Sequence, residues 1–191
     1  MSASTDSPSD LSGLEDRRLV RRYLALRDEE SFRAIYRRHS PKLYRLCLSM
    51  IGDPDLAADA VQDAWLRAAR GLDLFRWSSS LGTWLSGIAI NCCREMRRKQ
   101  PEEELPTEPA AEPDSADDWM DLIRAIASLP ERANEVLVLH EIFGYTHEEV
   151  AGILGIDEGT SKSQLSYARK LMRRWFEAQA GARPEGVDHV G

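Results

Sequence analysis

Residues 145–175, YTHEEVAGILGIDEGTSKSQLSYARKLMRRW, decide how the second half of the chain folds. Thr146, followed three residues later by Glu149, forms a capping box, in which each side chain binds a backbone N–H group at a helix start. Apolar residues at helical spacing follow, and Gly155 ends the helix because glycine adopts the left-handed conformation without steric penalty. Asp157 can cap a second helix. The stretch therefore predicts a helix-turn-helix.

The second helix of this motif, predicted over residues 159–174, is basic although the protein carries a net charge of −7. Its cations are Lys162, Arg169, Lys170, Arg173 and Arg174, and it has no acidic residue. One stripe, predicted to be buried, holds Ser161, Leu165, Ala168 and Met172. The opposite face holds Thr160, Ser163, Gln164 and Tyr167, mostly near the N-terminus, where a recognition helix contacts base edges. The pattern favours DNA binding, while a helical hairpin with a solvated basic face remains open.

Composition is typical of a protein that stays inside the cell. The 191 residues are 42% hydrophobic and 30% charged, and no run of about 18 apolar residues suggests a membrane span. The first residues lack the basic and apolar regions of a signal peptide. The cysteines, Cys47, Cys92 and Cys93, are odd in number, and we expect Cys93 to be the exposed thiol. We expect a cytoplasmic protein without membrane insertion.

The chain is predicted to be all-α, because no long segment shows the alternating pattern of a strand. Two small helical domains are expected, joined by an acidic extended linker. The expected parts are a disordered N-terminus (1–13), a first domain (14–100), the linker (101–118), a second domain containing the helix-turn-helix (119–178) and a flexible tail (179–191). The linker has four prolines and eight acids and no Lys or Arg, so it cannot fold alone. Local basic surface, rather than net charge, governs nucleic-acid binding.

Breaks in the pattern divide the two domains into helices. In the first domain, helices are expected from about residue 14, again after Ser40-Pro41, over residues 55–71, and over residues 81–99. A loop with Phe75, Arg76 and Trp77 precedes the last of these. In the second domain, a helical pair over residues 121–138 is broken at Leu129-Pro130.

The sequence offers no catalytic or metal-binding pattern. It lacks a glycine-rich phosphate loop, and neither His140-Glu141 nor His147-Glu148 has the second histidine of a metalloprotease motif. The cysteines do not have CxxC spacing, so no zinc site is expected. We therefore expect no cofactor, no metal and no enzymatic activity.

Several motifs in fixed order resemble the extracytoplasmic-function (ECF, group IV) sigma factors of the sigma-70 family, and the likeness runs from Leu14 to Trp175. The motifs are DLAADAVQDAWLRA (residues 55–68), SLGTWLSGIAINCCREMRRK (80–99) and LPERANEVLVLHEIFGYTHEEVAGILGIDEGTSKSQL (129–165). The resemblance implies an alternative sigma factor, which binds core RNA polymerase, recognises the −10 and −35 promoter elements and nucleates DNA melting. The two domains would be sigma regions 2 and 4.

The resemblance also assigns roles to single positions. Contact with the β′ clamp helices of the polymerase would be made by Asp59, Gln62 and Asp63. The −10 element would be bound by Arg76, Trp77, Asn91, Arg94, Arg97 and Arg98. The −35 element would be bound by Thr160, Lys162, Ser163, Gln164, Tyr167, Arg169 and Lys170. Further implied partners are the polymerase β flap and an anti-sigma protein.

Two residues of the second helix depart from the family pattern. Gln164 stands where arginine is common, and glutamine pairs with adenine as arginine pairs with guanine. Ser161 stands at a buried position that is usually valine, which implies weaker packing or a hydroxyl bonded back to the preceding turn. In the family, the linker runs along the path that nucleic acid takes through the polymerase. The resemblance therefore implies that the acidic linker mimics nucleic acid there, or that it serves only as a tether.

Two other functions are compatible with parts of the chain. A stand-alone helix-turn-helix regulator would form a stable dimer and bind duplex DNA without polymerase. An anti-sigma-like adaptor would bind a protein through its helical surfaces and would make no DNA contact through Arg97, Arg98 or Lys162. The motif containing Asp59, Gln62 and Asp63 disfavours both.

Overall fold

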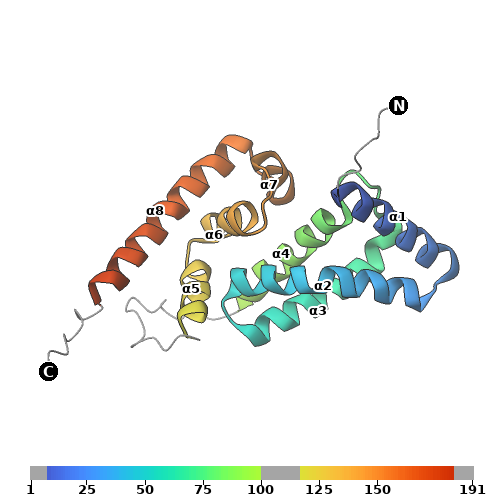
Figure 1. Ribbon diagram of the computed structural model, residues 1–191, viewed down its shortest axis with the longest axis horizontal. Helices are drawn as coiled ribbons and strands as arrows, with labels where there is room; N and C mark the ends of the chain where they lie inside the picture. The colour runs from blue at the N-terminus through green and yellow to red at the C-terminus, as the bar shows by residue number, and fades with distance from the viewer. Residues whose placement is uncertain (1–7, 100–116, 183–191) are drawn as a thin grey trace, which may run out of the picture. The chain divides into compact units, whose positions relative to one another are not determined.

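The computed structural model describes residues 8–99 and 117–182, which form helices joined by short connections and contain no strand (Figure 1). The first compact unit is built mainly from α1 (Pro8–Leu26), α2 (Glu29–Ile51), α3 (Pro54–Gly71), the 3-10 helix η1 (Leu72–Leu74) and α4 (Leu81–Lys99). The second is built mainly from α5 (Asp117–Ala127), α6 (Glu131–Leu137), the π-helix η2 (Val138–Ile142), α7 (His147–Leu154) and α8 (Glu158–Ala182). The predicted all-α fold of two domains is confirmed.

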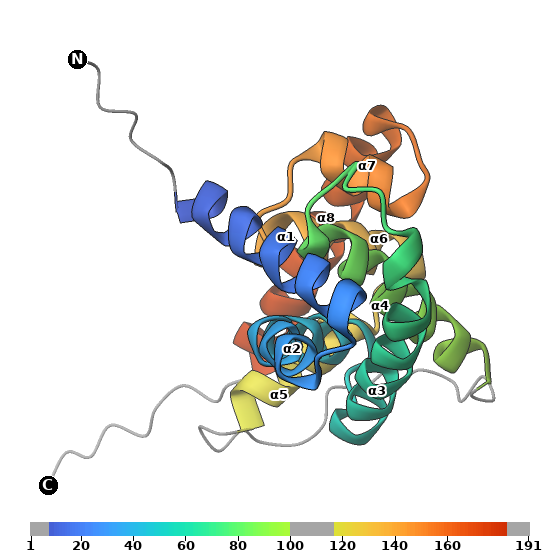
Figure 2. The ribbon, with the colours of Figure 1, turned by 90° about the vertical axis from the view of Figure 1, so that its right-hand side faces the viewer.

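Helices α3 and α4 pack against each other in the first unit (Figure 2). The carboxylate of Asp53 caps α3 by accepting hydrogen bonds of 2.9 Å from the backbone N–H groups of Asp55 and Leu56. The buried face of α3 is rich in alanine, which lets the two helices approach closely, and consists of Ala57, Ala60, Val61, Ala64, Trp65 and Ala68. This packing leaves the opposite, polar face of α3 to solvent.

Helix α2 corrects the expectation that Ser40-Pro41 starts a new helix. It runs without a break through Pro41, although proline in a helix interior removes a backbone hydrogen bond and costs about 3 kcal/mol. Buried residues lie on both sides of the proline, including Ile35, Leu43 and Leu46. Burial of this face over the whole helix outweighs the local preference for a break.

Helix α1 begins at Pro8, earlier than the start expected near Leu14, so residues 8–13 are helical rather than disordered. Proline is favoured at the first helical position because its φ angle is already helical there. A buried ion-pair network joins α1 to α2: the Asp16 carboxylate lies 3.1 Å from both the His39 Nε2 and the Arg38 Nη1. Asp16 is only 4% exposed. Residues 1–7 lie outside the described part of the chain.

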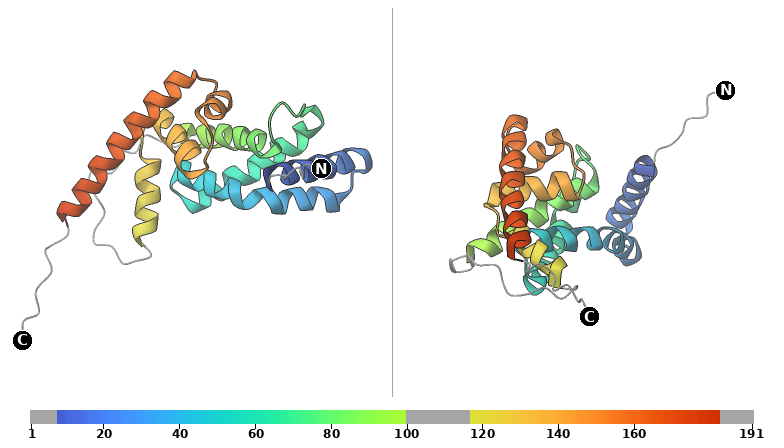
Figure 3. Two further views of the ribbon diagram at one scale, coloured as in Figure 1. Left: turned by 45° about the horizontal axis from the view of Figure 1, so that its top comes forward. Right: turned by 60° about the vertical axis from the view of Figure 1, so that its left-hand side comes forward.

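In the second unit, α8 packs along α6 and α7 (Figure 3). Helix α5 starts at Asp117, before the expected start near residue 121, and so includes the end of the predicted linker; the rest of that linker lies outside the described residues. Helix α8 continues to Ala182, whereas a flexible tail is predicted from residue 179. The run Glu177–Ala180 consists of strong helix formers, which explains the extension. The remaining tail, residues 183–191, is not described.

The cysteine expectation is wrong for Cys93, which is 1% exposed; Cys47 and Cys92 are also buried. The buried face of α4 is wide enough to include both members of the adjacent pair, together with Ser86, Ala89 and Ile90. Burial raises the pKa of the Cys92 thiol to about 12, so this thiol stays protonated. Within residues 8–99 and 117–182, no helix combines the length and the apolar character needed to span a bilayer.

Candidate nucleic-acid and partner interfaces

The helix-turn-helix has the local geometry that its sequence predicts. The Thr146 backbone N–H donates to the Glu149 carboxylate at 2.8 Å, and the Glu149 N–H donates to the Thr146 hydroxyl at 3.2 Å. Gly155 ends α7 in the left-handed conformation, with φ of 66°. The predicted stripe of α8 is buried, and its members are Ser161, Leu165, Ala168 and Met172. Most of the other described side chains of α8 are exposed.

The seven predicted −35 residues all lie on α8, and six of them are exposed while Gln164 is half-buried. Near the start of the helix, Lys162 pairs with Glu158 at 2.6 Å, and this hydrogen bond lowers the pKa of the Glu158 carboxyl. Farther along, the Arg169 Nε donates to the Glu141 carboxylate of η2 at 3.0 Å. Arg169 thus lies on the flank of α8 that faces η2.

A hydrogen bond from a histidine connects the two helices of the motif, and the sequence does not reveal it. The His147 Nδ1 lies 2.9 Å from the Oγ of Ser161, and the His147 ring stacks on His140 with centroids 4.2 Å apart. The His140 Nδ1 donates to the Tyr145 carbonyl at 2.8 Å. The expectation that the Ser161 hydroxyl bonds back to its own preceding turn is therefore wrong, because its partner is His147 of the neighbouring helix. Burial, the ring of His140 and the charge of Lys162 lower the pKa of His147.

An aromatic cluster holds the loop between η1 and α4. The Phe75 ring lies 4.8 Å from that of Trp77 and 4.9 Å from that of Trp84, on which it stacks. Trp77 is half-buried and has φ of 57°, a left-handed conformation that is rare for a bulky residue and is typical of functional loops. Arg76 beside it is exposed. The loop therefore presents its aromatic group in a fixed arrangement.

The other predicted −10 residues lie on the C-terminal half of α4. Asn91 is exposed and accepts a hydrogen bond of 3.2 Å from the Arg94 Nη1. The Arg98 Nε donates to the Arg94 carbonyl at 3.3 Å, and Arg97 is half-buried. Cations in a last helical turn complement the negative end of the helix dipole. The structure thus places one polar amide and three guanidinium groups along a short stretch of one helix.

The three residues on α3 that are predicted to contact the polymerase differ in their exposure. Asp59 and Gln62 are exposed, whereas Asp63 is half-buried and pairs with Arg67 at 2.7 Å. Arg67 also forms a two-pronged contact with Glu95 of α4, at 2.6 and 2.7 Å. This hydrogen bonding lowers the pKa of the Glu95 carboxyl. Asp63 therefore takes part in joining α3 to α4, which the sequence spacing does not reveal.

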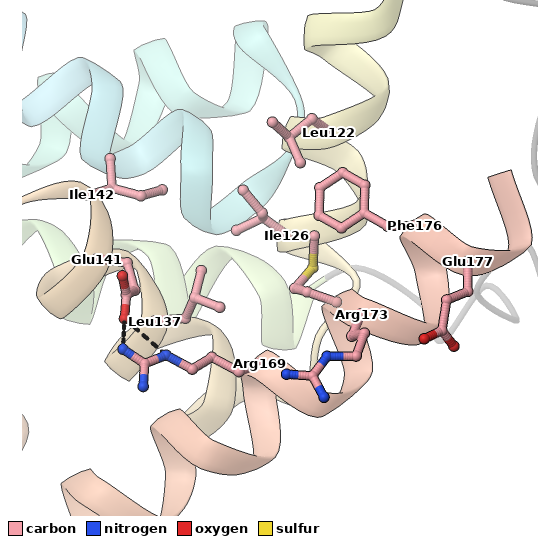
Figure 4. A pocket seen from close by; sticks show the side chains of 10 residues that line it. Leu122, Ile126, Leu137, Glu141, Ile142, Arg169, Arg173, Phe176 and Glu177 are labelled. Atoms are coloured by element: carbon pink, nitrogen blue, oxygen red, sulfur yellow. Dashed lines mark hydrogen bonds and ion pairs between the residues drawn. The ribbon is translucent and has the colours of Figure 1, made fainter. Parts of the chain in front are cut away.

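The second unit also contains an open groove of about 690 Å³ between α5, η2 and the C-terminal half of α8 (Figure 4). Its floor is apolar and its edge carries the Arg169–Glu141 pair together with Arg173 and Glu177. The apolar lining consists of Leu122, Ile126, Leu137, Ile142, Met172 and Phe176. Helical spacing alone does not distinguish the lining of such a groove from a buried core. No group of three or more His, Cys, Asp or Glu side chains in the described ranges is arranged to hold a metal ion.

Comparisons with known proteins agree with this two-part geometry. Residues 35–102 match the model of Sigma-70 region 2, and residues 119–172 match that of Sigma-70, region 4. The chain is 32% identical over 152 residues to the ECF RNA polymerase sigma factor SigM of Mycobacterium tuberculosis, covering 77% of this chain and 78% of that protein. It is 28% identical over 165 residues to the ECF RNA polymerase sigma-E factor of Escherichia coli, covering 76% of this chain and 86% of that protein.

Solved structures show the same fold. The chain is similar to the sigma factor RpoE of Bartonella quintana, solved in complex with the anti-sigma factor NepR, with a TM-score of 0.65, 27% identity, and coverage of 78% of this chain and 98% of that one. It also shares its fold with CnrH, solved with the cytosolic domain of CnrY, at a TM-score of 0.69 and 22% identity, covering 86% of this chain and 98% of that one. The chain belongs to the ECF family of RNA polymerase sigma factors and is an alternative sigma factor.

Proposed function

We propose that this sigma factor binds core RNA polymerase through the exposed face of α3, opens the −10 element with the Trp77 loop and α4, and reads the −35 element with α8. The two domains are proposed to be region 2, residues 14–100, and region 4, residues 119–178. The protein has no catalytic step of its own in this proposal, since the polymerase performs the chemistry. It acts in the cytoplasm, where polymerase and promoter DNA are found.

The observation that carries the proposal is the exposed pair Asp59 and Gln62 on a helix that is otherwise buried on its alanine-rich side. Residues three apart on a helix are neighbours, so the carboxylate and the amide form one polar patch. Such a patch suits a basic helical partner, as the β′ clamp helices are in this family. Asp63 supports the patch from beside it, through its ion pair with Arg67.

The −10 part of the proposal depends on the fixed aromatic loop. Extruding a base from a duplex costs a few kcal/mol, and stacking on an aromatic side chain returns about 1–3 kcal/mol. Trp77, held beside Phe75, offers such a ring, and Asn91 offers an exposed amide. Arg76, Arg94, Arg97 and Arg98 are proposed to follow the phosphates of the separated strand.

The −35 part depends on the outer surface of α8. Thr160, Lys162, Ser163, Gln164 and Tyr167 lie in its first half, the part of a recognition helix that enters the major groove. Lys170 is proposed to contact the DNA backbone, and so is Arg169, on the flank nearest Glu141.

The apolar groove bordered by α5, η2 and α8 is proposed to receive the β flap of the polymerase. An anti-sigma protein, such as the one bound to the Bartonella relative, is the proposed regulator.

Core binding tests the proposal directly. We expect D59K to weaken the affinity of the protein for core polymerase about tenfold or more, because a like charge then faces the basic clamp helices. The matched control is D73K, which reverses an exposed acid in η1 outside the patch and should bind core as the wild type does. Equal affinity of D59K and D73K would contradict the proposal. A stable dimer that binds promoter DNA tightly without polymerase would instead support a stand-alone regulator.

A further inference from the structure

The guanidinium group of Arg17, on α1, lies over the ring of Trp77. Its central carbon is 4.6 Å from the ring centroid, within the range of a cation–π contact. The same ring meets Phe75 at a tilt of 53°. The planar guanidinium group of Arg17 therefore covers a face of the Trp77 ring on which a base could stack.

The position of Arg17 follows from the burial of its neighbour, Asp16. The Asp16 carboxylate is held by His39 and Arg38 of α2, which fixes the rotation of α1 about its axis at this turn. His39 also lies against the start of α4, since a Cβ atom built at Gly82 would be 3.7 Å from its ring. One buried network thus positions both the helix that carries Arg17 and the helix that follows the Trp77 loop.

The chemistry of Arg17 suits an exchange of partners. A guanidinium group stacks on aromatic faces and also binds phosphate in a two-pronged manner. A nucleotide that places its base on Trp77 brings a phosphate within a few ångströms of the ring, where a cation is needed. Base stacking on an aromatic ring is stronger than an exposed cation–π contact, so the base displaces the guanidinium from the ring face.

We propose that Arg17 is a further residue of the −10 site, covering the stacking face of Trp77 in the free protein and moving to a backbone phosphate when an unpaired base takes that face. The proposal rests on the proposed role of Trp77 in binding the −10 strand. It extends the site from the loop and α4 to the N-terminal helix.

The test measures binding of the reconstituted holoenzyme to a fluorescently labelled single-stranded oligonucleotide that carries the non-template −10 sequence, over a series of salt concentrations. We expect R17A to weaken binding several-fold and to reduce the slope of log K against log salt by about 0.7, the value for one phosphate contact on a single strand. R17K should keep the slope, because it keeps the charge. The control is R18A, which removes an exposed arginine from the next position of α1 and should change neither quantity.

The outcomes separate this proposal from the role of Trp77. If R17A binds the oligonucleotide with the affinity and salt slope of the wild type while W77A binds weakly, Trp77 stacks a base and the inference about Arg17 is wrong. If W77A binds as the wild type does, the proposed role of Trp77 fails, and the inference fails with it. Unchanged thermal unfolding of R17A, expected for an exposed side chain, shows that lost binding does not come from lost structure.

Discussion

The His147 Nδ1 and the Ser161 Oγ, 2.9 Å apart, form a hydrogen bond between the two helices of the helix-turn-helix. Ser161 is completely buried, so its hydroxyl requires a partner, and the imidazole supplies one. The resemblance to the family implies a valine at this position. In this chain a polar contact therefore sets how α8 packs on α7.

The surroundings of His147 make the second unit sensitive to pH. The pKa of His147 is lowered from the ordinary value of 6.5 by burial, by His140 of η2, and by Lys162 and Arg169 of α8, while Glu158 of α8 opposes the shift. The native state therefore binds fewer protons than the unfolded state. The neutral His147 side chain therefore contributes fully to the free energy of unfolding above pH 6.5. This contribution is lost as the pH falls through 6.5 toward the pKa of His147 in the native state.

An NMR titration of the His147 ring should accordingly give a midpoint below 6.5. H147N is the matched variant, because the asparagine amide replaces Nδ1 as a hydrogen-bonding group but does not titrate. We expect the loss of unfolding free energy between pH 7.5 and 5.5 to be smaller in H147N than in the wild type. A midpoint at or above 6.5, or identical pH profiles for the two proteins, would refute this account.

The residue at position 164 should set one base of the −35 element. A glutamine side chain pairs with adenine and an arginine with guanine, each contact discriminating by about 1–3 kcal/mol. In a promoter library randomised over the −35 element, holoenzyme containing Q164R should shift its preference at one position from adenine to guanine. The other positions act as the internal control. An unchanged preference at every position would show that Gln164 does not read a base.

Two neighbouring residues of α8 should separate folding from DNA binding. Leu165 is 3% exposed, so L165A leaves a cavity and should lower the free energy of unfolding by about 2–5 kcal/mol. Tyr167 is 46% exposed, so Y167A should change stability by less than about 0.5 kcal/mol. We expect Y167A to weaken −35 binding nonetheless. Denaturant unfolding and promoter binding of both variants distinguish the roles, and a strongly destabilised Y167A would contradict them.

The thiols should be inert in the native protein. Cys47, Cys92 and Cys93 are all buried, so a reagent in solution does not reach them, and burial also raises the pKa of the Cys92 thiol to about 12. A colorimetric thiol reagent should detect no cysteine in the folded protein and three after denaturation. Rapid reaction of one thiol in the native protein, as an exposed Cys93 would give, would overturn this expectation.

Features with local causes could be predicted from the sequence. The capping box of Thr146 and Glu149 and the left-handed Gly155 depend on neighbouring residues only, and both occur as predicted. The buried stripe from Ser161 to Met172 follows from helical spacing, and it too is confirmed. The family motifs added the roles of the exposed faces, which spacing alone cannot provide.

Features with distant causes could not be predicted. Pro41 signals a helix start in isolation, but burial on both sides of it keeps α2 continuous. Cys93 is expected from the sequence to be exposed, but the buried face of α4 includes it together with Cys92. Arg17 and Trp77, like His147 and Ser161, are brought together by packing, and such pairs have no signature in sequence spacing.

Transcription with purified components tests the central claim most directly. Core polymerase, fragmented genomic DNA of the source organism and this protein are incubated with nucleotides, and the transcripts are mapped with and without the protein. The account predicts discrete new start sites that share a −10 and a −35 element, which D59K abolishes and D73K preserves. No new transcripts and no association with core polymerase would contradict it.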